Sequence, residues 1–122
     1  MIKFSKKGDW SKTISALKNT KSIEGILNKY GEEGVRALQA ATPINTGRLE
    51  RSWTYKVVKN QGTISLEWHN TDIEGGYNVA ILVQYGHGTA GGTYVQGIDF
   101  INPALRPVFD EIANSIWEEV TK

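Results

Sequence analysis

An apolar stripe near the C-terminal end of the chain constrains the fold more than any other feature. After Pro103, apolar residues recur at helical spacing along one face, namely Leu105, Val108, Phe109, Ile112, Ile116, Trp117 and Val120. The acidic residues of this segment lie off that face. The pattern predicts an amphipathic helix of about four turns that begins near Pro103. Because such a helix must bury its apolar face, the rest of the chain has to supply a partner layer.

A second helix is predicted between Ser22, a suitable N-cap, and Pro43. Its apolar residues follow a period close to 3.6, namely Ile23, Ile26, Leu27, Tyr30, Ala37, Leu38 and Ala41. Three glycines interrupt it at positions 25, 31 and 34, and each costs about 1 kcal/mol relative to alanine. The helix therefore needs tertiary support or the close approach of a neighbour.

The middle of the chain predicts a β-hairpin. Residues 53–59 (WTYKVVK) are rich in β-branched and aromatic residues, and residues 63–69 (TISLEWH) alternate apolar and polar. Gly62 suits the tight turn between them. Before the hairpin, Thr46 is a candidate cap for one helical turn over residues 47–51. Residues 77–85 (YNVAILVQY) fit a buried strand or a short helix equally well, because periodicity does not separate the two at this length.

The N-terminal segment predicts a short helix capped by Asp9, with Trp10, Ile14 and Leu17 on one face. The preceding residues are basic without the apolar run of a signal peptide, and are interpreted as a partly frayed terminus. A nucleic-acid-binding module that uses this basic segment is an alternative. The chain's net charge of +1 does not favour it.

These elements predict one domain over residues 1–122 of the α+β class. A small antiparallel sheet packs against two or three helices, and a long glycine-rich loop precedes the C-terminal helix. The chain has no cysteine, so neither a disulfide nor a thiolate metal site holds it together. No segment approaches the roughly 20 apolar residues that a membrane span needs.

The glycine-rich segment YGHGTAGGTY (residues 85–94) raises the question of a nucleotide site. Gly86, Gly88 and Gly91 have the spacing of a dinucleotide-binding turn. That turn should open a helix, however, and the residues that follow are β-like and end in a proline. The P-loop pattern is also nearly met, but its lysine position is occupied by Gly92. A nucleotide-binding domain therefore remains the weaker alternative to a mobile surface loop.

Other catalytic signatures are missing from the sequence. His69 and His87 are the only histidines, without the paired spacing of a zinc site, so His69 is expected at a strand end and His87 in a solvated loop. No G-x-S-x-G elbow supports a nucleophile. We therefore expect neither a metal nor a cofactor, while residue types alone do not decide whether a Ser/His/Asp triad forms. The four tryptophans are assigned mainly to the core.

Three motifs, in this order, resemble the small neck proteins of long-tailed phages, called tail-completion or minor head–tail joining proteins. They are AATPINTGRLERSW (40–53), YNVAILVQYGHGTAGG (77–92) and FINPALRPVFDEI (100–112). The family patterns are similar to "TPvdTGrLr-S", "YA-fvEyGT" and "fl-PAl". The resemblance spans about residues 23 to 120. It departs from the family at Gln84, where an acid is common, and at the extra Gly-His before Thr89.

The resemblance implies a structural, ring-forming subunit of the virion neck that completes the tail end and joins head to tail, and that is not an enzyme. It implies other copies of the chain and other neck and tail proteins as partners, assembly in the bacterial cytoplasm, no membrane, and DNA that passes through without specific binding. Arginine and the glycine-rich segment provide the interface candidates. These are Arg48, Arg51, Tyr85, Gly86, His87, Gly88, Thr89, Gly91, Gly92 and Arg106.

Overall fold

The computed structural model describes residues 2–5, 10–15, 20–43, 47–60 and 63–121, with backbone alone for 2–5, 10–15, 20–21 and 120. Its helices are α1 (Thr20–Ala41), α2 (Arg48–Arg51), α3 (Val79–Tyr85) and α4 (Ile101–Val120). Its strands are β1 (Ile2–Ser5), β2 (Trp10–Ser15), β3 (Trp53–Asn60), β4 (Thr63–Asn70), β5 (Ile73–Glu74), β6 (Tyr77–Asn78), β7 (Gly86–Gly88) and β8 (Tyr94–Gln96).

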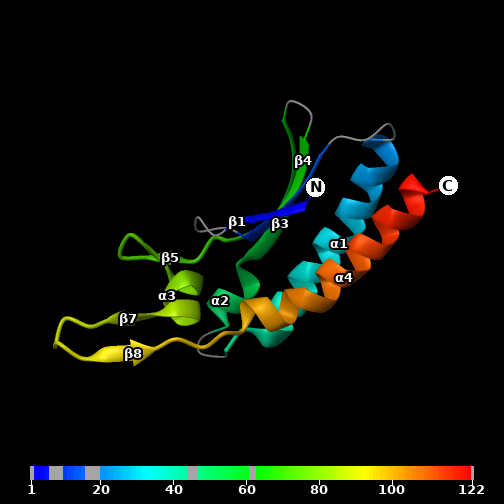
Figure 1. Ribbon diagram of the computed structural model, residues 1–122. Helices are drawn as coiled ribbons and strands as arrows, with labels where there is room; N and C mark the ends of the chain where they lie inside the picture. The colour runs from blue at the N-terminus through cyan, green and yellow to red at the C-terminus, as the bar shows by residue number, and fades with distance from the viewer. Residues whose placement is uncertain (1, 6–9, 16–19, 44–46, 61–62, 122) are drawn as a thin grey trace.

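The predicted α+β class is confirmed. Four strands form an antiparallel sheet in the order β1-β2-β4-β3, and β5–β6 and β7–β8 form two small antiparallel ribbons. Figure 1 shows α1 and α4 side by side and antiparallel, with α1 between α4 and the sheet. The region from β5 to β8, which includes α3, extends from one end of this body. We call residues 73–98 the distal region and the β7–β8 hairpin (86–97) the arm.

The core follows from the spacing of apolar residues. On α1, Ile23, Leu27, Tyr30 and Leu38 are buried, and β4 buries Ile64, Leu66 and Trp68 at every second position. On α4 the buried residues are Ile101, Leu105, Val108, Ile112 and Ile116. Each large apolar side chain removed from water contributes about 1.5–3 kcal/mol. A single apolar core therefore holds the two helices and the sheet together.

Two of the α1 glycines let the sheet approach the helix closely. A Cβ on Gly31 would overlap the ring of Tyr55, and a Cβ on Gly34 would overlap the indole of Trp68. The Trp68 indole is fully buried and its Nε1 donates a hydrogen bond to the Gly31 carbonyl at 3.0 Å. The predicted close approach of a neighbour is therefore confirmed at positions 31 and 34. Gly25 faces open space.

The prediction of a helix over residues 10–17 is wrong. Residues 10–15 form β2, which pairs with β4 in the register Trp10↔Trp68 and Ile14↔Ile64. Residues 2–5 form β1 at the edge of the sheet, where we expected a frayed terminus. A spacing of four residues between Trp10 and Ile14 suits both a helix and a strand, so local pattern did not decide between them. Asp9 and Leu17 lie outside the described residues.

The structure also decides the conformation of residues 77–85 and corrects the position of Trp117. Residues 79–85 are helical, which settles the choice left open for residues 77–85. Trp117 was assigned to the apolar stripe of α4, but its side chain is 68% exposed, because the buried face of the helix passes through its neighbour Ile116. Trp53 and Trp68 are core residues as expected. The side chain of Trp10 lies outside the description.

Candidate functional site

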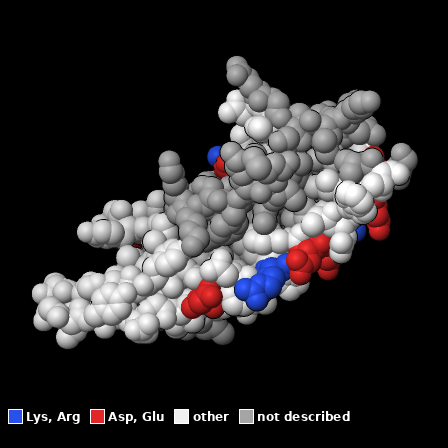
Figure 2. Space-filling view, viewed as in Figure 1, with Lys and Arg blue, Asp and Glu red and all other residues white. Residues whose placement is uncertain are grey.

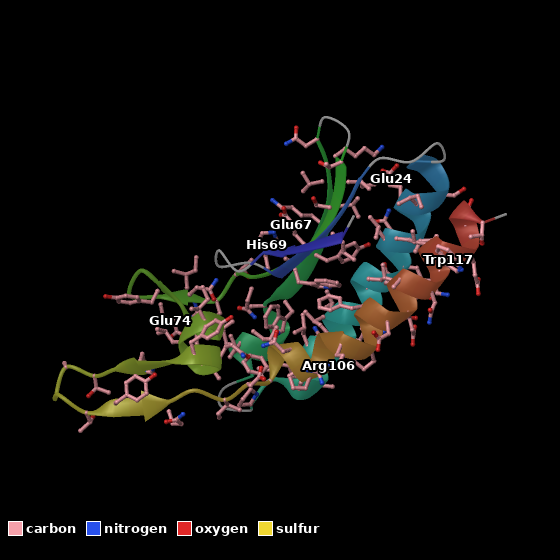
Figure 3. All side chains as sticks on the ribbon, in the orientation of Figure 1. Glu24, Glu67, His69, Glu74, Arg106 and Trp117 are labelled. Carbon is pink, nitrogen blue, oxygen red and sulfur yellow. The ribbon has the colours of Figure 1, made fainter. Side chains whose placement is uncertain are left out.

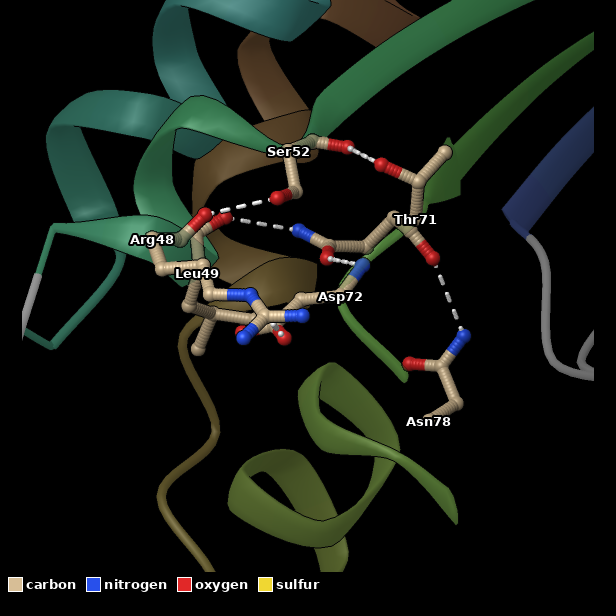
Figure 4. A network of polar contacts seen from close by, with 7 residues as sticks. Arg48, Leu49, Ser52, Thr71, Asp72 and Asn78 are labelled. Atoms are coloured by element: carbon tan, nitrogen blue, oxygen red, sulfur yellow. Dashed lines mark hydrogen bonds and ion pairs between the residues drawn. The ribbon is translucent and has the colours of Figure 1, made fainter. Parts of the chain in front are cut away.

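A polar network joins the first two sequence motifs where the sheet ends (Figure 4). The side-chain amide of Asn70, at the end of β4, donates a hydrogen bond to the Leu49 carbonyl at 2.8 Å. The backbone N–H of Thr71 donates to the Ser52 carbonyl at 3.0 Å, and the Ser52 hydroxyl donates to the Arg48 carbonyl at 2.6 Å. The predicted helical turn near residues 47–51 is therefore confirmed as α2, and it is fixed against the exit of β4. Thr46 lies outside the described residues.

Asp72 carries this network into the distal region. Its side chain is 2% exposed, and its Oδ1 lies 3.1 Å from Nε of Arg48, whose side chain is 58% exposed. The Asp72 carbonyl accepts a hydrogen bond from the Val79 N–H at 3.0 Å, at the start of α3. Asn78 caps α3 by accepting from the Ile81 N–H, and its amide donates to the Asn70 carbonyl at 3.2 Å. Arg48 thus makes an intrasubunit ion pair at the root of the distal region.

Arg48→Ala is expected to lower the free energy of unfolding by about 1–2 kcal/mol, because it leaves a buried carboxylate without its cation. The exposure of Arg48 keeps the loss below that of a fully buried pair. Arg51→Ala removes the same charge from an exposed position on α2. It should change the free energy by less than about 0.5 kcal/mol. Urea unfolding of both variants makes the comparison, and equal losses would contradict this assignment of Arg48.

Gln84 ties the base of the arm to the start of α4. Its Oε1 accepts hydrogen bonds from the backbone N–H groups of Phe100 at 3.1 Å and Ile101 at 3.0 Å, two of the donors that a helix start leaves unpaired. Its Nε2 donates to Oδ1 of Asp99 at 2.7 Å. This hydrogen bond is the main cause that lowers the pKa of Asp99; burial opposes it, while Asn102 and the charge of Arg106 assist. Gln84 is therefore a buried helix cap.

At the base of the arm, the backbones of its two strands come into close contact at Gly86 and Gly97. A Cβ on Gly86, whose φ is 80°, would lie 2.5 Å from the Val95 carbonyl oxygen, and a Cβ on Gly97 would lie 2.6 Å from the Gln84 carbonyl oxygen. The Tyr94 hydroxyl also donates to the Tyr85 carbonyl at 3.0 Å beside this contact. The close backbone contact accounts for Gly86 without a phosphate ligand. It also identifies Gly97, which the sequence analysis did not single out.

The glycine-rich segment is a hairpin and not the loop that we expected. Gly86, His87 and Gly88 pair with Gln96, Val95 and Tyr94. The turn is closed by the Thr89 N–H, which donates to the Thr93 carbonyl at 2.8 Å, and by a hydroxyl–hydroxyl contact of 2.6 Å between the two threonines. A helix precedes this segment and a strand follows it, which reverses the order that a dinucleotide-binding turn requires.

Apolar side chains are exposed throughout the distal region. Among the side chains that the structure describes, seven large hydrophobic ones are exposed, and six of them lie between positions 73 and 98, namely Ile73, Tyr77, Tyr85, Tyr94, Val95 and Ile98. In the view of Figure 2 the arm carries neither acidic nor basic colour, in contrast to the body around α4. Concentrated exposed apolar surface marks an interaction site. Except for Tyr85, the sequence analysis did not single out these residues. The signal that could have found them is that no Lys or Arg occurs between positions 60 and 105.

A pocket of about 330 Å³ lies where the arm meets the body. Its apolar walls include Pro43, Leu49, Val79, Val83 and Ile98. His87 also lines it, and its Nδ1 is buried without a hydrogen-bond partner among the described residues. The expectation that His87 is a solvated loop residue is therefore wrong, because strand pairing at the arm base turns the ring inward. Tyr85, Gly86 and His87 belong to the base, and Gly88, Thr89, Gly91 and Gly92 to the outer hairpin.

The remaining candidates are spread over the body. Arg51 is exposed on α2, and Arg106 is exposed on α4, where Figure 3 places it near the start of that helix. His69 lies at the end of β4 as expected, with Nε2 3.0 Å from Oε1 of Glu67. No group of three metal-ligating side chains occurs within the described ranges. In the same part of the chain, no helix is long and apolar enough to cross a bilayer.

A family model confirms the class of protein. The HK97-gp10-like family, described as "Bacteriophage HK97-gp10, putative tail-component", matches residues 10–86, which is more than half of the chain. The chain therefore belongs to this family of phage tail components. The match covers β2, β3 and β4 of the sheet, α1, the polar network of Figure 4 and α3, and it ends at Gly86, the first residue of the arm. Comparisons with curated proteins and with solved structures give no match.

Proposed function

We propose that the chain is a ring-forming structural subunit of the virion neck that completes the tail end and joins head to tail. The observation that carries the proposal is the distal region, which exposes six large apolar side chains on a chain of a phage tail family. A ring requires each subunit to present two different surfaces. The distal region and the body would provide them, and the outer hairpin around residues 88–93 would contact a neighbouring subunit or the next ring.

The other parts of the proposal follow from this role. The subunit would assemble in the bacterial cytoplasm and act in the virion by contacts with its own copies and with other neck and tail proteins, without enzyme activity, metal or cofactor. The genome would pass through the ring without specific binding. The acidic residues Asp110, Glu111 and Glu118 on the exposed side of α4 favour this, since phosphate binding depends on clustered Lys and Arg.

Val95→Asp tests the proposal by placing a charge on an exposed residue of β8. If the arm is an assembly surface, the variant should keep its unfolding midpoint but lose about tenfold or more in self-association or in binding to tail-end particles, because a carboxylate would be desolvated in an apolar interface. Asn114→Asp adds the same charge on the exposed side of α4 and should assemble normally. Sedimentation velocity and electron microscopy provide the measurement.

A monomeric state at high concentration, together with failure to bind any purified neck or tail protein, would reject a joining role. Equal assembly by Val95→Asp and Asn114→Asp would instead remove the arm from the interface while leaving the ring possible.

A further inference from the structure

We infer that the β5–β6 hairpin of one subunit docks into the hollow between α1 and β3 of a second copy of this chain. The inference rests on the proposed self-association and names its contact. The docking residues are Glu74 and Tyr77, and the receiving residues are Glu32 and Arg36 with the apolar wall beside them.

The β5–β6 hairpin is a rigid tip with an exposed aromatic side chain. Glu74 and Tyr77 face each other in its register, and Gly75 and Gly76, with φ of 60° and 82°, form the two-residue turn between them. Positive φ at both turn positions is the geometry of the tightest hairpins, so little conformational entropy is left to lose on docking. The Tyr77 side chain is 64% exposed. A stiff aromatic residue of this kind is a typical interface anchor.

The hollow that receives the hairpin, on the second copy of the chain, is lined by α1 and by the edge strand β3. Its volume is about 280 Å³, and its lining consists of Glu32, Val35, Arg36, Trp53, Thr54 and Tyr55. The strand order leaves β3 at the edge of the sheet, so the hollow opens at the side of the body. Val35 and Tyr55 provide an apolar wall of partly buried side chains. A tyrosine ring is the kind of group that such a wall can bury.

The charges at the two surfaces are complementary. Arg36 and Glu74 are both exposed, and within the described ranges neither makes an ion pair. With the Tyr77 ring in the hollow, the Glu74 carboxylate can pair with the Arg36 guanidinium. The Tyr77 hydroxyl can then donate to Glu32, the second charge at the rim. Each polar group at the edge of the contact would thus have a partner.

The distribution of charge along the chain favours a second copy as the occupant. The distal region holds a single charged residue, Glu74, because all other Asp and Glu residues and all Lys and Arg residues lie outside residues 73–98. Figure 3 places Glu74 at the end of the molecule opposite Trp117. Two distal regions therefore offer each other no opposite charge, whereas the body offers the exposed Arg36. This asymmetry orients copies head to tail, as a ring requires.

Charge reversal tests the contact in the full-length chain. Glu74→Arg and Arg36→Glu should each weaken self-association by about tenfold, because each places like charges together at the rim. The double variant should restore association to within about threefold of the native chain, since the pair is re-formed with reversed sign. Glu118→Arg makes the same charge change on the exposed side of α4 and should have no effect. Sedimentation velocity gives the association constants.

Cysteine pairing tests the same contact directly, because the native chain has no cysteine. A mixture of the Glu74→Cys and Arg36→Cys variants, oxidised gently, should form disulfide-linked dimers that neither variant forms alone. If the native chain associates but the mixture gives no excess of dimers and the double charge reversal does not restore association, this contact is wrong and the proposed ring stands. If the native chain does not associate at all, this contact is rejected, and the joining role is rejected as well when the chain also binds no purified neck or tail protein.

Discussion

Gly34→Ala should lower the free energy of unfolding by about 2 kcal/mol or more, although alanine is the better helix former by about 1 kcal/mol. The added Cβ would overlap the indole of Trp68, which is fully buried and rigid. The ring cannot move aside without losing the hydrogen bond from its Nε1 to the Gly31 carbonyl, and an unpaired buried indole N–H adds about 1–3 kcal/mol. Overpacking therefore outweighs the gain in helix propensity.

Gly25→Ala is the matched control for this prediction. Gly25 lies on the same helix, and a Cβ there meets nothing within 4 Å. The substitution should therefore stabilise the protein by up to about 1 kcal/mol. Urea unfolding of the two variants should give changes of opposite sign. Changes of the same sign would mean that α1 does not approach the sheet through Gly34.

Local periodicity was enough to predict the two long helices and the central hairpin. Their buried residues repeat at the spacing of the element over many turns or strand positions, as at Leu27 and Leu38 on α1 or Ile64 and Leu66 on β4. The same method failed for residues 10–15, whose partners in β4 lie 48 to 58 positions further along the chain. It also misplaced Trp117, because burial along α4 depends on how the helix rotates against α1 and the sheet.

The candidate site was less visible in the sequence. The glycine spacing located the arm, but the contacts that shape it join residues far apart in the chain, such as Gly86 with Val95 and Gly97. Exposure of Tyr77 and Ile98 is a tertiary property, and no pattern of their neighbours encodes it. The signal that was available is the absence of Lys and Arg between positions 60 and 105, which sets the distal region apart from the rest of the chain.

Gln84→Leu is expected to lower the free energy of unfolding by about 2–4 kcal/mol, because a shorter, apolar side chain leaves two buried N–H groups without an acceptor. These are the Phe100 and Ile101 donors at the start of α4. The loss should concentrate at the junction, so amide exchange in β7 and β8 should accelerate more than exchange in β4. Gln96→Leu, on the exposed face of β8, is the control and should have little effect.

The pKa of Asp99 reports on the same junction. In the native chain the Gln84 hydrogen bond holds this pKa below its ordinary value of 3.8, so the stabilisation is present at neutral pH and is lost as the pH falls through the lowered pKa. In Gln84→Leu the pKa of Asp99 should rise towards its ordinary value, and the corresponding loss of stability in acid should diminish. An NMR titration of the Asp99 carboxyl measures the shift, and an unchanged pKa would contradict the assigned hydrogen bond.

Gln84→Glu distinguishes the role of the Gln84 Oε1 acceptor from that of the Nε2 donor. It also introduces the acidic residue that is common at this position in the neck proteins that the sequence resembles. The variant keeps an acceptor for the Phe100 and Ile101 donors but replaces the amide that donates to Asp99 with a second carboxylate. At pH 7 it should be less stable than the native chain by about 1–3 kcal/mol, because two like charges share one site. Protonation of either carboxyl restores a donor, so the deficit should shrink as the pH falls towards about 5. A deficit that does not vary with pH would show that the donor to Asp99 is dispensable, and that the acceptor alone holds the arm to α4.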